Sequence, residues 1–222
     1  MSRRLLPLWT ALLLVASAVA ATAEPKPFRI DPNHSMVGFN IRHFFSRTQG
    51  RFKEFSGTLQ LDEKNLATSS VEFTVQTASV DTENERRDGD LRGKNFFQVD
   101  SFPTMTFKST KVVPGPDKSL LVYGDLTIRG VTKPVTLETT MLGFGQVAMG
   151  GRPARTIAGF EAKASIDRKD FGIVWNNVLD QGGTMLGDDV TITLLTEWVQ
   201  VDPNAPQPAA GQRPAPPAPD KK

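Results

Sequence analysis

The chain contains no cysteine, and this absence excludes several classes of protein at once. Disulfide scaffolds, zinc-thiolate sites, thiol nucleophiles and lipid anchors on an N-terminal cysteine all need that residue. A protein without disulfides depends on the packing of its core, in whatever compartment it works. We therefore expect a domain large enough to bury a substantial apolar core.

Histidine is also scarce, because His34 and His43 are the only two in the sequence. They bracket the segment HSMVGFNIRH, whose residues alternate as in a β-strand. An odd separation sends the two rings to opposite faces, and no H-x-H or H-E-x-x-H spacing occurs, so we predict no metal site. His43 shares the inward parity of Val37 and Phe39. It is either a hydrogen-bonded strand end or a polar group at the mouth of an apolar cavity, whereas His34 is expected to secure the start of the strand.

Recognisable catalytic motifs are missing as well. No G-x-S-x-G elbow, P-loop or G-x-G-x-x-G after a strand occurs. Carboxylates are dense between Asp81 and Asp90, but arginines interleave with them, which is typical of a salt-bridged helix surface. We predict that the protein is not an enzyme.

A single long apolar run stands near the N-terminus. Arg3 and Arg4 precede Leu5–Ala21, and an A-x-A cleavage motif follows. We predict that residues 1–23 are a cleavable signal peptide and that the protein is periplasmic. The run is short for a membrane span and Pro7 interrupts it. The paired arginines leave both the general and the twin-arginine export routes open.

An excess of either charge is also lacking. The chain has 26 basic and 24 acidic residues, so removing Arg3 and Arg4 leaves 24 of each. A mature protein that is about neutral gives no indication of nucleic-acid binding. At the other end, residues 202–222 contain 7 prolines in 21 residues, and we predict a disordered, extended tail there.

Residues 24–201 are expected to form one domain of alternating strands. Period-two patterns, separated by turn signals, occur in about eight segments: Ser35–His43, Phe55–Leu61, Val71–Val75, Met105–Phe107, Gly124–Ile128, Val135–Met141, Phe160–Ile166 and Val190–Trp198. We predict an all-β fold, an antiparallel eight-stranded barrel, because closure removes the exposed edges.

One segment, Asp81–Phe97, breaks this rhythm. Thr82 and Glu85 have the spacing of a capping box, so a helix is predicted to start at Thr82. Gly89 and Gly93 should keep this helical insertion short. The two phenylalanines that end it are expected to cover or plug the sheet.

Small residues occupy several inward positions, namely Gly57, Gly124, Ala162 and Ala164. A barrel of about eight strands is either filled by its own side chains or holds one ligand. Small inward residues favour a cavity, and the alternative is that large residues opposite fill the space.

Taken together, the segments resemble the YceI-like family. The resemblance spans roughly residues 28–201 and rests on motifs in the same order: Asp31-Pro32-x-His34-Ser35-x-Val37-x-Phe39-x-Ile41-x-His43, Gly50-x-Phe52, Phe55-x-Gly57, Val80-x-Thr82, Arg87-Asp88-x-x-Leu91, Phe96-Phe97, Phe102-Pro103-x-Met105-x-Phe107-x-Ser109-Thr110, Gly124-Asp125-Leu126-Thr127-Ile128-Arg129-Gly130-Val131-Thr132-Lys133, Arg168-x-Asp170-Phe171-Gly172 and Gly187-Asp188-Asp189-Val190.

The resemblance implies a lipocalin-like barrel with a helix near one opening, a polyisoprenoid lipid threaded through the interior, and dimerisation in some members. The expected function is non-catalytic binding, storage or transport of a polyprenyl or quinone lipid, with no other cofactor and no stable membrane anchor. The head group is expected at His43, Arg87 and Asp88. The other expected ligand contacts are apolar: Val37, Phe39, Ile41, Phe55, Phe73, Val75, Phe96, Phe97, Met105, Phe107, Leu126, Ile128, Phe171 and Trp175.

Two other functions fit the same residues. One is an enzyme that acts on a lipid head group in the same cavity, with His43 as base beside Arg87 or Asp88. The other is a stress-response interaction protein whose barrel is filled and whose tail docks partners.

Overall fold

The computed structural model describes residues 24–202 except 149, 152 and 181. The expected signal peptide and residues 203–222 of the expected tail lie outside the described residues. The described strands are β1 (Lys26–Ile30), β2 (Met36–His43), β3 (Ser46–Phe52), β4 (Phe55–Leu61), β5 (Ser70–Gln76), β6 (Val80–Asp81), β7 (Thr104–Pro114), β8 (Ser119–Ile128), β9 (Val131–Val147), β10 (Arg155–Asp167) and β11 (Leu186–Gln200). The helices are α1 (Glu85–Arg92) and the 3-10 turns η1 (Pro32–His34), η2 (Leu66–Thr68), η3 (Thr77–Ser79) and η4 (Arg168–Phe171).

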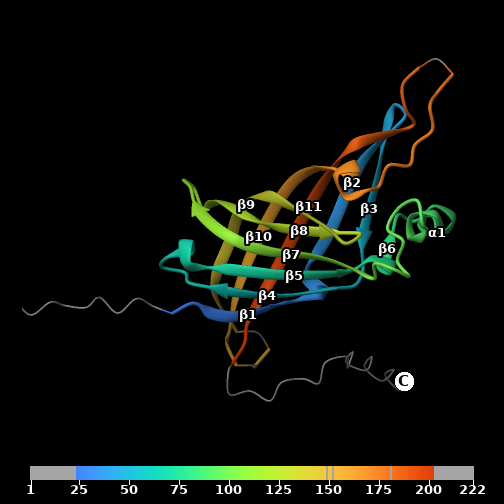
Figure 1. Cartoon of the computed structure of the whole chain (residues 1–222). Coiled ribbons are helices and arrows are strands. Elements are labelled where there is room, and N and C mark those ends of the chain that lie inside the picture. The colour runs from blue at the N-terminus through green and yellow to red at the C-terminus, as the bar shows by residue number, and fades with distance from the viewer. Residues whose placement is uncertain (1–23, 149, 152, 181, 203–222) are drawn as a thin grey trace, which may run out of the picture.

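The strands form one closed antiparallel barrel (Figure 1). Along the chain β4, β5, β7, β8, β9, β10 and β11 pair in turn, and β1 closes the ring by pairing with both β4 and β11. Every ladder among the described strands is antiparallel, and closure of the ring leaves no wall strand with a completely unpaired side.

Eight strands make up the wall, although eleven segments are described. β1 and β2 run along β11 as one strand interrupted by η1, and β3 and β4 follow as a second strand interrupted at residues 53–54. β5 and β6 form a third, interrupted by η3. The predicted eight-stranded barrel is confirmed, whereas β1, β3 and β6 were not predicted as separate segments.

Period-two alternation places the apolar side chains inside, as predicted. In the ladders, Val37 of β2 lies opposite Leu194 of β11 and Phe52 of β3, so all three side chains share the inner face. Val37 and Phe52 are buried. Such buried alternate rows supply the hydrophobic term that holds the fold, since the chain has no disulfide.

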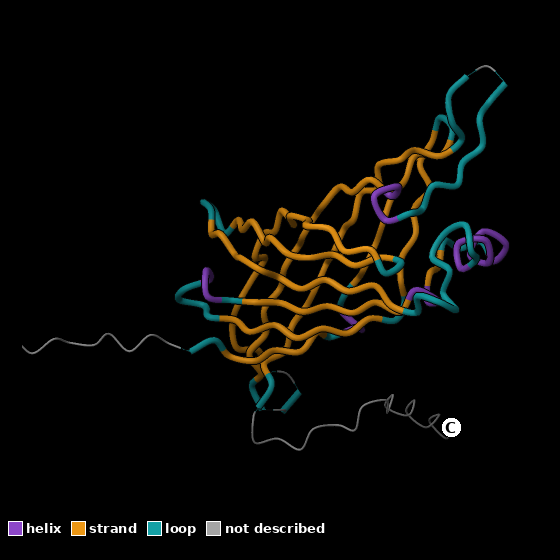
Figure 2. The backbone as a smooth tube through the Cα atoms, in the orientation of Figure 1, coloured by secondary structure: helices purple, strands orange, loops and turns teal. Residues whose placement is uncertain are grey.

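The two ends of the barrel differ in what lies there. We define the helix end by α1, η4 and the β2–β3 turn, and the opposite end by η2 and the β7–β8 and β9–β10 turns. Figure 2 shows α1 and the long 172–185 loop at the helix end. The start of β1 and the end of β11 lie side by side at the opposite end, where Val201 N donates to Pro27 O at 2.8 Å. No helix of the described residues is long and apolar enough to cross a membrane.

The helix starts later than predicted. Its N-cap is Asn84, whose side chain accepts a hydrogen bond from Arg87 N at 3.0 Å, and not Thr82. Glu83 has φ +61, a left-handed conformation that a right-handed helix cannot include, so the helix begins only beyond it. It ends at Gly93 after eight residues, as short as the glycines predicted.

Candidate functional site

The barrel interior contains an elongated cavity of about 740 Å³. All eight strands contribute to its lining, and most of the lining is apolar. The predicted ligand contacts that line it are Val37, Phe39, Ile41, His43, Phe73, Val75, Arg87, Phe96, Phe97, Met105, Phe107, Leu126, Ile128, Phe171 and Trp175. A cavity of this volume is within the range of small-molecule sites.

Two predicted contacts, Phe55 and Asp88, are not part of the lining. Phe55 is at the start of β4, where its ring stacks on Phe73 with centroids 5.7 Å apart. Asp88 is buried, and its carboxylate accepts hydrogen bonds from the backbone N and the hydroxyl of Thr82. Phe55 was predicted from its parity along β4 and Asp88 from its position next to Arg87. Neither argument shows that the Phe55 ring stacks on Phe73 or that the Asp88 carboxylate is bound by Thr82.

The inward glycines do not leave empty space, contrary to the simplest expectation. A Cβ on Gly57 would lie 2.9 Å from the rings of Phe73 and Trp198, and one on Gly124 would collide with Phe107. Aromatic rings therefore occupy the space beside these glycines. Of the four small residues, Ala162 lines the cavity, whereas Gly57, Gly124 and Ala164 do not.

All ionisable side chains in the described lining come from the helix end. They are His43 at the end of β2, Arg87 and Asp90 of α1, Lys94 just after it, and Arg168 of η4. The remaining lining toward the opposite end is apolar or carries only hydroxyl groups. An amphipathic ligand thus finds polar partners at one end of the cavity only.

Arg87 faces the cavity but is not free. Its Nε donates to Thr82 Oγ1 at 2.7 Å and one Nη donates to Thr82 O at 2.8 Å. Thr82 in turn donates to Asp88, so Thr82 links the guanidinium to the carboxylate. This network fixes the start of α1 against β6.

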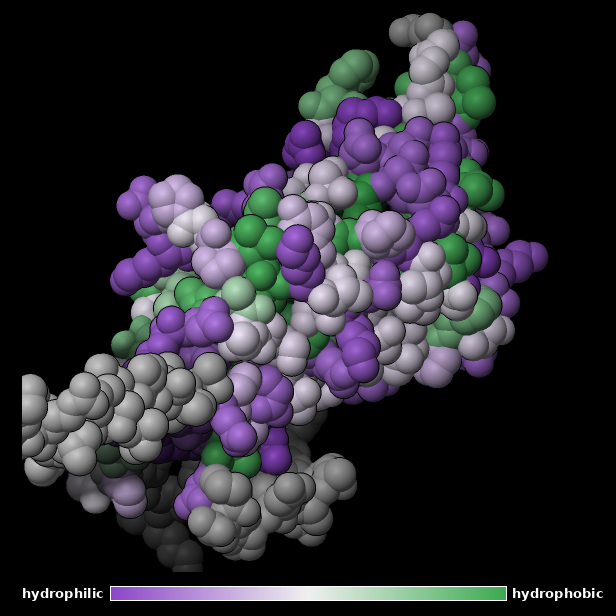
Figure 3. Space-filling model, turned by 60° about the vertical axis from the view of Figure 1, so that its left-hand side comes forward, coloured by the Kyte–Doolittle hydropathy of each residue, from purple (hydrophilic) through white to green (hydrophobic). Residues whose placement is uncertain are grey.

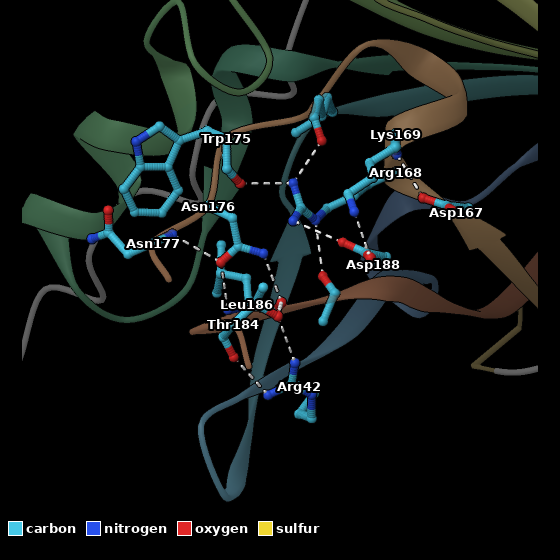
Figure 4. A network of polar contacts seen from close by, with 12 residues as sticks. Arg42, Asp167, Arg168, Lys169, Trp175, Asn176, Asn177, Thr184, Leu186 and Asp188 are labelled. Carbon is cyan, nitrogen blue, oxygen red and sulfur yellow. Dashed lines mark hydrogen bonds and ion pairs between the residues drawn. The ribbon is translucent and has the colours of Figure 1, made fainter. Parts of the chain in front are cut away.

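Arg168 is the centre of a second network, at the root of the long loop (Figure 4). It is 3% exposed, and it donates to Ile173 O at 2.6 Å, Trp175 O at 2.8 Å and Gly187 O at 2.8 Å. Its guanidinium also pairs with Asp188 at 3.0 Å. The backbone at both ends of the loop is therefore tied to one buried side chain.

At the surface, the carboxylate of Asp188 pairs with a second cation besides Arg168. Lys169 Nζ lies 2.7 Å from Asp188 Oδ2. Lys169 and, less strongly, Arg168 lower the pKa of Asp188 below its ordinary value, despite the partial burial of the carboxylate. The pair stays ionised at neutral pH, so the loop anchor persists there.

Aromatic contacts join the loop to the segment that follows α1. The rings of Phe96 and Trp175 lie 5.4 Å apart, and Phe97 packs edge-on against Phe52 at 5.5 Å. The prediction that the two phenylalanines cover the sheet is confirmed, since both line the cavity. They cover the helix end of the lumen together with Trp175.

The two histidines face opposite sides of the wall as predicted, although His34 lies in η1 before β2, so the parity of an uninterrupted strand is not the reason. His43 lines the cavity, whereas His34 is in η1 on the outside, where Nδ1 is 3.1 Å from Asp31 Oδ2 and 3.8 Å from Glu197 Oε1. The hydrogen bond to Asp31, helped by both carboxylate charges, raises the pKa of His34. These three side chains are close enough for a shared cation, but one hydrogen bond, between His34 and Asp31, and the longer ion pair to Glu197 are the contacts that join them.

Sequence reasoning missed the role of Arg168, although it noted the residue as part of a motif. Its partners are carbonyl oxygens in a loop that has no periodicity. The one signal available was the motif Arg168-x-Asp170-Phe171-Gly172 with an acidic residue, Asp188, twenty positions after the arginine.

A closed eight-stranded barrel with an apolar lumen and charges at one end is the architecture of a ligand-holding β-barrel. Residues 28–198 match the model of the YceI-like domain. "Protein YceI" of Shigella flexneri and that of Escherichia coli O157:H7 are each 42% identical to this chain over 176 residues, covering 78% of it and 88% of the relative. The chain belongs to the YceI-like family.

Solved structures show the same fold. BcnA of Burkholderia cenocepacia is similar with a TM-score of 0.64 and 26% identity, covering 76% of this chain and 98% of BcnA. A polyisoprenoid binding domain from Saccharophagus degradans is similar with a TM-score of 0.56 and 15% identity, covering 78% and 98%. At that identity the second likeness concerns the fold alone.

Proposed function

We propose that the protein binds a long isoprenoid lipid, of the polyprenyl or quinone type, inside the barrel, as a non-catalytic periplasmic carrier or reservoir. The observation that carries this proposal is the cavity of about 740 Å³, which is apolar along its length and charged only at the helix end. The Saccharophagus degradans domain, named for polyisoprenoid binding, has the same fold, which is consistent with the proposal.

The lining suits a chain with one polar end. Each CH₂-sized group moved from water to an apolar site contributes about 0.8 kcal/mol, so several isoprene units support tight binding before ordering costs. A polar head group placed in the apolar part would lose its hydrogen bonds at a cost of several kcal/mol. The head group therefore belongs at the helix end, near His43, Arg87 and Lys94.

Two alternatives find less support. An enzyme that uses His43 needs Arg87 or Asp88 as its partner, yet among the described residues the hydrogen bonds of both side chains go to Thr82. If turnover of a lipid head group were found and His43→Ala kept it, His43 would not be its base. A barrel filled by its own side chains does not agree with the cavity.

The proposal is tested on protein purified from cells that make polyprenyl and quinone lipids. Extraction with organic solvent and mass spectrometry should recover an isoprenoid in a fixed ratio to protein. Repeated recovery of empty barrels from such cells would contradict the proposal. Deleting residues 202–222 should leave the lipid content unchanged, whereas a partner-docking function would change with that deletion.

A pair of neighbouring substitutions separates cavity binding from adsorption. Ala162→Phe extends a ring into the lumen that Ala162 lines, and should lower the lipid recovered per protein. Lys163→Phe adds the same ring on the outer face, where the Lys163 ammonium pairs with Glu161, and should leave the lipid content unchanged. Equal lipid content in both variants would place the lipid outside the barrel.

A further inference from the structure

The β2–β3 turn carries two phenylalanines at the tip of a hairpin. Phe45 is completely exposed and Phe44 is 39% exposed. Phe44 has φ +51, a conformation that two-residue hairpin turns usually assign to glycine or asparagine. A bulky ring there is unfavourable for the turn, and the ring of Phe45 gains no burial from the fold. The Phe44 ring packs edge-on against His43 with centroids 4.5 Å apart, whereas the exposed ring of Phe45 is better explained by a contact outside the domain.

A second segment presents an apolar side chain beside this turn. Val178 of the long loop is 81% exposed and forms an isolated β-bridge with Thr184. The loop is held against the hairpin, because Phe44 N donates to Met185 O at 2.8 Å and the Arg42 guanidinium donates to Thr184 O at 3.1 Å.

Both segments project from the barrel at the helix end (Figure 1). In the space-filling view, hydrophobic residues occur among hydrophilic ones on this projection (Figure 3). We define the apolar tip as Phe44, Phe45 and Val178.

Basic side chains flank the apolar tip. Residues 40–50 include Arg42 and Arg47 and no acidic residue, and the loop residues 173–186 include one acidic residue, Asp180. Arg47 donates to Asn40 Oδ1 at 3.1 Å, and in the described part of the chain neither arginine forms an ion pair with a carboxylate. Arg42 donates hydrogen bonds to Phe44 O and to Thr184, so its positive charge is held beside the tip without a carboxylate to neutralise it. Exposed apolar side chains bordered by such cations fit the interface of an anionic lipid bilayer.

We propose that the apolar tip docks the helix end of the barrel onto a bilayer surface that contains anionic lipid head groups. The rings of Phe44 and Phe45 enter the interface, and Arg42 and Arg47 contact lipid phosphates. His43 directly precedes the tip and lines the cavity, so docking brings the charged end of the lumen to the membrane. Exchange of lipid between the membrane and the lumen at this end would follow from docking, and this step alone rests on the proposed function.

The test measures binding of the chain from Glu24 onward to lipid vesicles. That chain contains every described strand and omits the apolar run at residues 5–21, which would bind lipid by itself. We expect co-sedimentation with vesicles of phosphatidylcholine and phosphatidylglycerol, and weaker binding to phosphatidylcholine alone. In Phe45→Trp protein, brominated lipids should quench the fluorescence of the new indole. Wild-type protein that stays in the supernatant with the anionic vesicles would overturn the proposal.

The decisive variant replaces both rings without harming the turn. Phe44→Gly with Phe45→Ser creates a Gly-Ser turn that suits the positive φ, so the fold should be retained. Partition to anionic vesicles should fall at least about tenfold, because burying even one phenylalanine is worth more than that factor. Leu142→Ser, which removes a 58% exposed side chain at the opposite end, is the matched control and should bind like wild type.

Charge is tested separately with Arg47→Gln, which should lower binding to anionic vesicles about fivefold and leave binding to phosphatidylcholine unchanged. Equal binding of the double variant and the wild type would overturn the proposal. A wild-type dimer that the double variant dissociates, without vesicle binding, would assign the tip to a second copy instead. Lipid inside the barrel is measured in the same proteins. Vesicle binding without interior lipid contradicts the proposed function alone. Interior lipid without vesicle binding contradicts docking alone.

Discussion

The two ends of the barrel share the same strands but differ in chemistry. At the helix end, the lining includes ionisable side chains from α1, η4 and β2, and the loop backbone is tied to buried Arg168. At the opposite end, the lining consists of aliphatic and hydroxyl side chains such as Leu66, Val112, Leu120 and Thr139. The period-two pattern of the strands produces the apolar lumen, whereas the segments at the strand ends supply its ionisable side chains.

This asymmetry implies a direction for any amphipathic ligand. A charge costs little where other charges, hydrogen-bond partners and solvent are near, and a great deal where the lining is apolar. The difference between the ends should therefore appear as a difference in tolerance to the same substitution.

The largest effect is expected when a charge is placed at the apolar end. Leu120→Lys replaces a 5% exposed leucine and should lower the free energy of unfolding by about 4 kcal/mol, because core packing is lost and an unpaired ammonium is buried. Met185→Lys places the same charge in the lining of the helix end, where the long side chain can reach solvent, and should cost less than about 1 kcal/mol. Urea unfolding of both variants measures the contrast, and equal losses would show that the ends do not differ.

A smaller loss is expected when the helix end loses its anchor. Arg168→Met removes the donor to three carbonyl groups and should lower the free energy of unfolding by about 3 kcal/mol, since those oxygens lose their partner. Proteolysis within residues 173–185 should accelerate. Arg29→Met, on the exposed face of β1, should stay within about 0.5 kcal/mol of wild type. Unchanged protection of the loop would contradict the anchoring role.

Between the ends, the fit of rings to glycines can be tested. Gly57→Ala places a Cβ 2.9 Å from both Phe73 and Trp198 and should lower the free energy of unfolding by about 2 kcal/mol through overpacking. Gly145→Ala, where a Cβ meets nothing within 4 Å, should be neutral or slightly stabilising. Thermal or urea unfolding distinguishes the two, and a neutral Gly57→Ala would mean that the rings can move into the lumen.

The smallest effect is expected on the outer wall, away from both ends. The pKa of His34 is raised, so its ion pair with Asp31 stabilises the fold fully below the ordinary histidine pKa of about 6.5. That contribution is lost as the pH rises through the raised pKa of the folded state. An NMR titration should find the pKa of His34 above its ordinary value and lower in Asp31→Asn protein. A His34 pKa unaffected by Asp31→Asn would rule out this carboxylate as the cause.

Strand parity predicted much of the barrel and part of the site. The alternation of Val37, Phe39 and Ile41 predicted that these side chains and that of His43 point into the lumen. All four residues line the cavity. β3 was missed because Ser46–Phe52 presents threonine and glycine inward and carries too little apolar signal. β6, with two residues, is too short for any pattern.

Features that depend on contacts between distant segments were not predictable in this way. The expected cap at Thr82 was wrong because Thr82 serves Asp88 and Arg87 and the backbone turns at Glu83. The space expected above Gly57 is filled by Trp198, a residue on another strand far along the chain. Periodicity gives the face on which a residue lies, but not which neighbour occupies the space above it.

The pairing that closes the barrel sets when folding can finish. β1 is made first and β11 last, yet the ring closes only when Arg29 pairs with Val199 and Ile30 with Trp198. Contacts between such distant positions require a long loop to close, and folds dominated by them form slowly, in milliseconds to seconds. Until β11 arrives, β10 and the β1–β2 strand are both open edges. A chain that stops before β11 therefore cannot form a smaller barrel and should aggregate through these edges.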